Sequence, residues 1–156
     1  HLFNIPLSKI EVVVHPQSLV HSFVEFIDGS LLAQIAENQM VIPIQYAMTY
    51  PERKKGLVKP FDFNKFNKFE FFPTDDKKFT CLPLAYYAAK TGGSMPCFMN
   101  AANEVLVERF LKGQISWLEI GKKLEKLLIS HTIEDGLKLE TLTLVDKQAR
   151  EEAKLA

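Results

Sequence analysis

The sequence predicts an α+β fold, in which a partial antiparallel or mixed sheet comes first and a small C-terminal helical bundle follows. Two observations support this fold class. Residues 10–35 alternate polar and apolar side chains and are rich in β-branched residues, a pattern that is typical of strands. From residue 82 onward, apolar residues recur at the spacing of amphipathic helices, and glycines separate the helical segments.

Three strands are expected in the first third of the chain, at residues 10–14, 21–27 and 30–35. The first is a β-branched run that leads into the His15-Pro16 bend. The other two flank Asp28-Gly29, which fits a two-residue type I′ turn because that turn requires positive φ at both central positions. Together they predict one sheet of at least three strands.

A two-residue turn would also fix which side chains share a face of the hairpin. Val24 would lie opposite Ala33, and Ser22 opposite Ile35. One face would then be a core face, made of Ser22, Val24, Phe26, Leu31, Ala33 and Ile35. The other would carry polar groups and is where we expect function; it comprises His21, Phe23, Glu25, Ile27, Leu32 and Gln34.

A short helix is predicted at residues 44–50, with Pro43 at its first turn and Pro51 beyond its end. Residues 51–75 contain three prolines and are interpreted as a connector between domains. Within it, residues 61–72 interleave phenylalanines with polar residues. This pattern is compatible with a surface for single-stranded nucleic acid. We favour an extended segment whose phenylalanines pack into the protein, because Asp62 and Glu70 dilute the positive charge.

Four helices are predicted in the second half of the chain. The first spans 82–91 and stops at Gly92-Gly93, the second runs from near Phe98 to Leu111, and the last fits 140–154. The third has the clearest start signal, a capping box of Ser116 with Glu119 three residues later. Its expected inner face is Trp117, Ile120, Leu124, Leu127 and Leu128. Short amphipathic helices joined by short loops predict a small bundle.

Composition narrows the classes of function. The chain has 156 residues, with 19 basic and 19 acidic side chains, so its net charge is zero. Nucleic-acid and membrane-surface proteins favour a basic excess, and no apolar run reaches the ~20 residues of a membrane span. Cys81 and Cys97 have no metal-like spacing and are interpreted as buried reduced thiols, which suits a cytoplasmic protein.

His21 is the strongest candidate for a functional side chain. It belongs to the predicted polar face of the hairpin, with Glu25 two strand positions along and Gln34 on the neighbouring strand. Such neighbours hold a histidine in one tautomer so that it can donate to a ligand. The alternative is a sheet histidine that pairs with Glu25 or faces a partner subunit. His15, before Pro16, is interpreted as structural.

Six short blocks follow one another along almost the whole chain: His-Pro-Gln-Ser at 15–18, Asp-Gly-Ser-x-Leu-Ala-Gln at 28–34, Pro-Ile-Gln-Tyr-Ala-Met-Thr-Tyr-Pro at 43–51, Cys-Leu-x-Leu-Ala at 81–85, Asn-Ala-Ala-Asn-Glu at 100–104 and Val-Asp-x-x-Ala-Arg at 145–150. With these blocks in this order, the chain resembles 1-deoxy-D-xylulose 5-phosphate reductoisomerase, an enzyme of the non-mevalonate isoprenoid pathway. The resemblance rests on the series of blocks together, because no single block is specific.

The resemblance implies the C-terminal portion of that enzyme. Residues 1–50 would end its catalytic and dimerisation domain, 51–75 would be the connector and 76–156 the helical C-terminal domain. In the family, the glycine-rich dinucleotide turn, the metal-binding carboxylates and the substrate-phosphate residues all precede the segment that this chain matches. We therefore expect a fragment that binds no metal and is inactive alone.

For the intact protein, the resemblance implies a homodimer that uses NADPH and a divalent cation, Mg²⁺ or Mn²⁺. It would convert deoxyxylulose phosphate to 2-C-methyl-D-erythritol 4-phosphate. His21 would lie at the periphery of the catalytic site and Met40 toward the nicotinamide. The segment around Met40 departs from the usual sequence of the family, since Asn38-Gln39 replaces Pro-Asp and Val41 replaces Arg. Packing is the alternative role for this methionine.

The rival hypothesis is a non-enzymatic module, a sheet with a helical bundle that only oligomerises or docks. Composition is equally compatible with it. Asn100 and Asn103 lie one helical turn apart in their block and are interpreted as an architectural joint rather than as catalytic residues.

Overall fold

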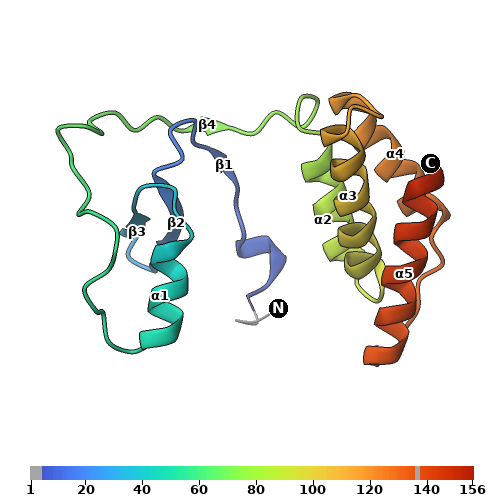
Figure 1. Cartoon of the computed structure of the whole chain (residues 1–156), viewed down its shortest axis with the longest axis horizontal. Helices are drawn as coiled ribbons and strands as arrows, with labels where there is room; N and C mark the ends of the chain where they lie inside the picture. Colours follow the sequence, from blue (N-terminus) through green and yellow to red (C-terminus); the bar gives the residue numbers. More distant parts are fainter. Residues whose placement is uncertain (1–4, 136–137) are drawn as a thin grey trace. The chain divides into compact units, whose positions relative to one another are not determined.

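The computed structural model describes residues 5–135 and 138–156, and within them the predicted α+β class is confirmed (Figure 1). The chain divides into two compact units. The helical unit comprises His1–Glu11 and Asp75–Ala156, and the hairpin unit comprises Val12–Thr74. A short 3₁₀ helix, η1 (Leu7–Lys9), precedes the first strand.

Two separate two-stranded sheets lie in the hairpin unit. Strand β1 (Val13–Val14) pairs antiparallel with β4 (Phe72–Pro73), and β2 (Val20–Glu25) pairs antiparallel with β3 (Leu31–Ile35). The prediction of one sheet of three consecutive strands is therefore wrong. Strand β1 finds its partner in the segment interpreted as a connector, and this long-range pairing leaves no local sequence pattern.

The turn of the hairpin has three residues rather than two. The Phe26 amide donates to the Ser30 carbonyl at 2.9 Å, and the Gly29 amide donates to the Phe26 carbonyl at 2.9 Å. Gly29 has φ +80°, whereas Asp28 is not among the described residues with positive φ, so the predicted type I′ turn is wrong. This is a tight turn followed by a left-handed glycine, the usual three-residue hairpin loop. The Asp28 carboxylate closes it by accepting hydrogen bonds from the Ser30 amide and hydroxyl.

The longer turn shifts the register of the hairpin by one residue. Val24 lies opposite Leu32 rather than Ala33, and Ser22 lies opposite Gln34 rather than Ile35. The pairing is irregular between Val20 and Ser22, at the position of His21. Because side chains alternate along a strand, the predicted division into a core face and a polar face is wrong. One face carries Ser22, Val24, Leu32 and Gln34, and the other carries Phe23, Glu25, Leu31 and Ala33.

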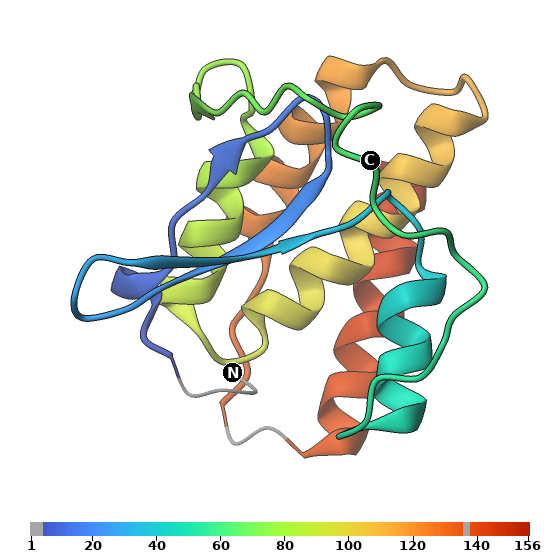
Figure 2. The same cartoon turned by 90° about the vertical axis from the view of Figure 1, so that its left-hand side faces the viewer.

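Helix α1 (Val41–Thr49) follows the hairpin, with Pro43 in its first turn as predicted. Figure 2 shows the hairpin with its turn at the end away from α1. The phenylalanines of the connector pack on one another: the ring centroids of Phe61 and Phe66 are 5.3 Å apart, and those of Phe61 and Phe69 are 6.3 Å apart. This favours the packing interpretation of the segment over a nucleic-acid surface.

The helical unit is a bundle of α2 (Cys81–Thr91), α3 (Met95–Leu111), α4 (Trp117–Ser130) and α5 (Leu139–Leu155) (Figure 1). All four helices were predicted, and α3 begins three residues earlier than expected. The largest fully buried hydrophobic side chains of its core are Phe98, Met95, Leu106, Leu124 and Leu128. α5 contributes Val145, Ala149 and Ala153, whose small side chains let it pack closely on α3.

The predicted capping box of α4 is confirmed, with the Ser116 amide donating to the Glu119 carboxylate at 2.7 Å. Trp117 is 63% exposed, so its place in the expected inner face is wrong; its ring packs edge-on against Phe110 instead. Cys81 and Cys97 are free and half-buried rather than buried, and burial raises the pKa of both thiols. No helix in the described part of the chain has the length and apolar character needed to cross a membrane.

Candidate functional site

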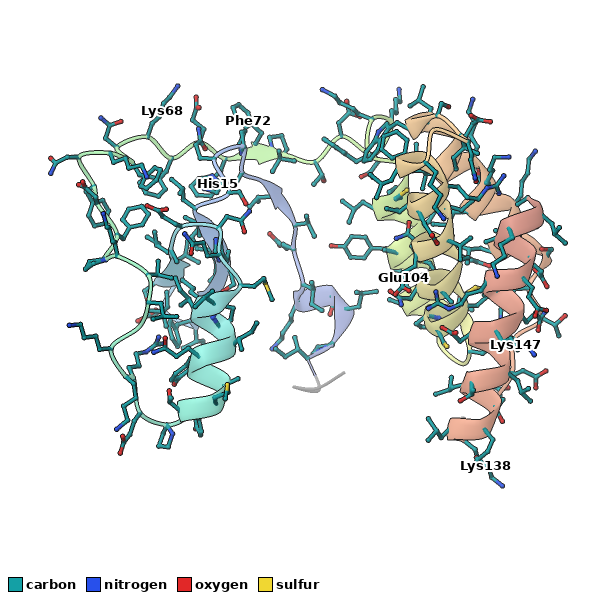
Figure 3. The ribbon with its side chains drawn as sticks, in the orientation of Figure 1. His15, Lys68, Phe72, Glu104, Lys138 and Lys147 are labelled. Carbon is teal, nitrogen blue, oxygen red and sulfur yellow. The ribbon has the colours of Figure 1, made fainter. Side chains whose placement is uncertain are left out.

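The bend between β1 and β2 carries the first of the candidate residues. His15 Nδ1 lies 2.8 Å from the Glu70 carbonyl, and its ring stacks on Phe71 with centroids 4.6 Å apart. In Figure 3, His15 lies beneath the segment that carries Lys68 and Phe72. These contacts agree with a structural role for His15, which fastens the bend to the connector.

Gln17 fastens the same bend from its other side. Its Nε2 donates to the Glu70 carboxylate at 2.7 Å, while its Oε1 accepts from the Glu70 amide at 3.2 Å. The hydrogen bond from Lys68, followed by that from Gln17, lowers the pKa of Glu70. A glutamine suits this position because its amide offers both a donor and an acceptor.

The backbone conformation of Ser18 was not predicted from the sequence, although Ser18 belongs to the block at 15–18. Its φ is +51°, the one positive value outside glycine in the described residues, and its amide donates to the His15 carbonyl at 3.0 Å. A non-glycine residue in this region costs on the order of 1–3 kcal/mol, and such residues cluster at functional sites. Serine has no strong preference for this conformation, so the sequence carried no signal of it.

His21 is exposed, and its partner differs from those expected. Its Nε2 lies 3.2 Å from the Ser18 carbonyl, and no hydrogen bond to Glu25 or Gln34 is present in the described residues. A carbonyl only accepts, so Nε2 carries the hydrogen and Nδ1 of the neutral ring is free to accept. His21 is thus hydrogen-bonded to the carbonyl of the strained Ser18, and Nδ1 of its ring offers an acceptor on the surface.

Met40 lies at the N-terminus of α1 and is 70% exposed. Its carbonyl accepts from the Ile44 amide at 3.2 Å. This exposure does not match the packing role that was the alternative for Met40. The structure gives no contact between Met40 and His21, so the two candidates do not form a cluster within the described part of the chain.

A metal centre or a dinucleotide cradle does not fit the residues described. No group of three or more His, Cys, Asp or Glu side chains in this part of the chain is placed to hold a metal ion. Glycines with positive φ occur in the hairpin turn and at helix ends, not in a glycine-rich turn between a strand and a helix.

Two of the six blocks meet in the helical unit. Arg150 on α5 binds Glu104 on α3 at 2.8 Å and Asp146 at 2.8 Å, while the Asn100 amide donates to Glu104 at 2.9 Å. The guanidinium lowers the pKa of Glu104 and of Asp146. The ion pair of Arg150 with Glu104, which is labelled on α3 in Figure 3, joins α3 to α5 and agrees with the interpretation of this block as an architectural joint.

Ser94 and His131 form a buried polar pair that was not predicted from the sequence. His131 Nε2 lies 2.8 Å from the Ser94 hydroxyl, which also accepts from the Glu134 amide at 2.9 Å. The ring stacks on Phe98 at 4.0 Å. Ser94 and His131 lie 37 positions apart in the sequence, so no local spacing reveals them.

These features define a class: an α+β scaffold with a strained, fastened bend in its hairpin unit and a tightly packed helical unit. The model of the family described as "DXP reductoisomerase C-terminal domain" matches residues 35–152. The chain belongs to this family, as its resemblance predicted. The family is defined by sequence, and the site alone would not have revealed it.

Curated proteins with similar sequences are themselves 1-deoxy-D-xylulose 5-phosphate reductoisomerases. The chain is 59% identical over 97% of its length to the 1-deoxy-D-xylulose 5-phosphate reductoisomerase of Protochlamydia amoebophila, and 45% identical over 96% to that of Endomicrobium trichonymphae. It covers 40% and 39% of these two proteins, so it spans about two fifths of the length of the curated relatives it matches.

Solved structures match over nearly the whole chain. The Zymomonas mobilis reductoisomerase in complex with NADPH matches 99% of this chain with a TM-score of 0.89 and 42% identity. A DOX-P reductoisomerase structure with fosmidomycin and magnesium matches 99% with a TM-score of 0.89 and 39% identity. In both cases the match covers 41% of the solved chain.

Proposed function

We propose that this chain is the C-terminal part of a 1-deoxy-D-xylulose 5-phosphate reductoisomerase. The intact protein would use NADPH and a divalent cation, Mg²⁺ or Mn²⁺, to convert deoxyxylulose phosphate to 2-C-methyl-D-erythritol 4-phosphate. The observation that carries this proposal is 59% identity to a reductoisomerase across 97% of the chain. The solved relatives with NADPH and magnesium support the same cofactors.

The chain alone is proposed to be inactive. What supports this proposal is that no group of three or more His, Cys, Asp or Glu side chains in the described residues is placed to hold a metal ion, and that their positive-φ glycines lie in the hairpin turn and at helix ends. What this chain contributes is the fastened bend around Ser18 and His21, and a rigid helical unit. These would position the reacting groups rather than supply them.

His21 and Met40 are proposed to lie at the edge of the intact site, His21 near the substrate and Met40 toward the nicotinamide. The geometry that supports His21 is its position beside the strained Ser18 and its free Nδ1 acceptor. Met40 is supported by its exposure at the start of α1. Both side chains are accessible, as contact with a ligand requires.

The His21 proposal is tested by His21→Gln in the full-length protein. Glutamine retains a donor to the Ser18 carbonyl but loses the imidazole acceptor, so we expect kcat/KM to fall about tenfold, which corresponds to one hydrogen bond of ordinary strength. His15→Gln is the comparison, since it should act on stability through the bend. Unchanged kcat and KM in His21→Gln would leave His21 with a structural role only.

The function itself is tested by following NADPH oxidation with deoxyxylulose phosphate and Mg²⁺. Full-length protein should turn over, and a mass-verified sample of residues 1–156 should not. Lack of turnover by the full-length protein with both Mg²⁺ and Mn²⁺ would favour the rival hypothesis, a non-enzymatic oligomerisation or docking module. Turnover by residues 1–156 alone would contradict the proposed inactivity of the chain.

A further inference from the structure

A pocket of about 280 Å³ lies within the hairpin unit, between α1, the end of β3 and the connector. Ile42 and Tyr46 line it from α1, and Val58 and Phe61 line it from the connector. The volume is just below the usual range of ligand pockets, ~300–1,000 Å³. It therefore suits a ligand of one ring or a short branched chain. Neither His21 nor Met40 lines it, so it is distinct from the site proposed above.

Three of the side chains that line this pocket are cations: Arg53, Lys54 and Lys59. The acidic residue of the lining, Glu37, is bound by Lys65 at 3.2 Å, and Lys54 is bound by Glu52. In the described chain, no carboxylate forms an ion pair with Arg53 or Lys59. The pocket consequently has two cations without an anionic partner in the described residues, which is an environment for an anion.

Specific contacts hold this wall of the pocket in place. The Arg53 guanidinium carbon lies 4.1 Å from the centroid of the Tyr46 ring, and the Gln45 amide donates to the Lys54 carbonyl at 2.9 Å. A Cβ at Gly56 would lie 2.8 Å from Gln45 Oε1, so a side chain there would displace the Gln45 amide from this position. Arg53 is thus placed by its contact with Tyr46, and the backbone at Lys54 is fastened to α1 by Gln45.

Burial separates the two halves of the lining. Ile42, Val58 and Phe61 are half-buried, whereas Arg53 and Lys59 are exposed. An apolar base below a cationic rim suits a ligand that has an apolar group at one end and a negative charge at the other. We propose that this pocket binds a phosphomonoester with a small apolar group, with the phosphate at Arg53 and Lys59 and the apolar group on Ile42, Val58 and Phe61.

The experiment titrates full-length protein with phenyl phosphate by isothermal titration calorimetry. Inorganic phosphate and phenol are titrated separately, because each offers only one half of the proposed ligand. Saturable binding of phenyl phosphate, tighter than that of either half-probe, is expected. The absence of saturable binding up to the solubility of the probe would overturn the proposal.

Variants then locate the binding. Arg53→Ala and Lys59→Ala should each weaken phenyl phosphate binding about three- to tenfold, as expected for a partly exposed charge. Lys55→Ala is the matched control, because Lys55 lies in the same basic run but outside the lining, and its affinity should not change. Val58→Trp fills the base without altering charge and should abolish binding. An equal loss in Lys55→Ala, or full affinity in the Arg53 and Lys59 variants, would overturn the proposal.

Discussion

At the residue scale, His131 shows how burial decides protonation. The Ser94 hydroxyl accepts from the Glu134 amide, so its own hydrogen is available to His131 Nε2. Nδ1 of the ring is buried and has no hydrogen-bond partner in the described residues. Burial lowers the pKa of His131 below the ordinary value of 6.5, while Glu152 and Glu134 act in the opposite direction. The folded helical unit therefore favours the neutral ring.

The pH dependence of stability follows from this shift. Between the lowered pKa of the folded state and 6.5, the unfolded chain binds a proton at His131 that the folded chain does not, so stability rises with pH. The contribution of His131 to the free energy of unfolding is complete above pH 6.5 and is lost as the pH falls from 6.5 through the lowered pKa of the folded state. Thermal unfolding of the full-length protein should give a Tm that falls on acidification from pH 7.5 to 5.5.

His131→Gln should flatten this dependence, because glutamine does not titrate. The matched comparison is His21→Gln, which makes the same exchange at an exposed position outside the helical unit. Carboxylates whose pKa values are lowered, such as Glu104 and Asp146, titrate below this pH range and do not contribute. If Tm depended on pH equally in His131→Gln and in the unmodified protein, the assignment of this dependence to His131 would be wrong.

At the element scale, the contact between α2 and α4 depends on the absence of a side chain. Gly121 of α4 is buried, and a Cβ there would overlap Thr80 Oγ1 at the start of α2. Thr80 makes no side-chain capping hydrogen bond, so little is lost when it is shortened. The absence of a side chain at Gly121 therefore makes room for Thr80 between the two helices.

Gly121→Ala should lower the free energy of unfolding by about 1–3 kcal/mol, the usual cost of overpacking, even though alanine is the better helix former. Adding Thr80→Ala removes the overlapping oxygen and should restore most of that loss. Urea unfolding of the two single variants and the double variant measures the coupling. Additive effects in the double variant would show that the two residues do not interact.

Which elements could be predicted depends on whether their signals are local. The capping box of Ser116 and Glu119 and the stop at Gly92 lie within a few residues of the helix ends, and both were read correctly. The hairpin itself was also found. Its register was not, because Asp-Gly suits both a two-residue and a three-residue loop and the structure uses the longer one.

The remaining features depend on tertiary contacts. The pairing of β1 with β4 and the meeting of Ser94 with His131 join distant segments, so neither spacing nor propensity indicates them. The candidate site was predicted only in part. His21 was named with the wrong neighbours, and Ser18 was missed because its strain is a property of the backbone. The roles of His21 and Met40 stay predictions.

At the scale of the whole molecule, the hairpin carries apolar side chains on both of its faces. Val24 and Leu32 are 52% and 62% exposed on one face, and Phe23 and Leu31 are 40% and 60% exposed on the other. Exposed apolar surface of this kind marks an interaction site. The family resemblance implies a homodimer for the intact protein, and we propose that the hairpin lies in the interface of this dimer.

Leu32→Glu in the full-length protein should weaken the dimer, because it places a charge in an apolar contact. Light scattering after size exclusion, across a range of concentrations, should show monomer at concentrations where the unmodified protein is dimeric. Leu57→Glu, at a connector position that is 94% exposed, serves as the control and should leave the dimer intact. A dimer of unchanged strength in Leu32→Glu would exclude this face of the hairpin from the interface.

The pairing of β1 with β4 makes the hairpin unit an insertion. The helical unit is discontinuous in sequence, since its first segment ends at Glu11 and its second begins at Asp75. The inserted unit enters and leaves through two strands that are hydrogen-bonded side by side, with Val13 opposite Pro73. Adjacent ends are what allow a domain to be inserted into another without disturbing its host. A short linker between residues 11 and 75 could thus replace the inserted unit, and η1 would keep its place on α2, where the Tyr86 hydroxyl donates to the Ile10 carbonyl.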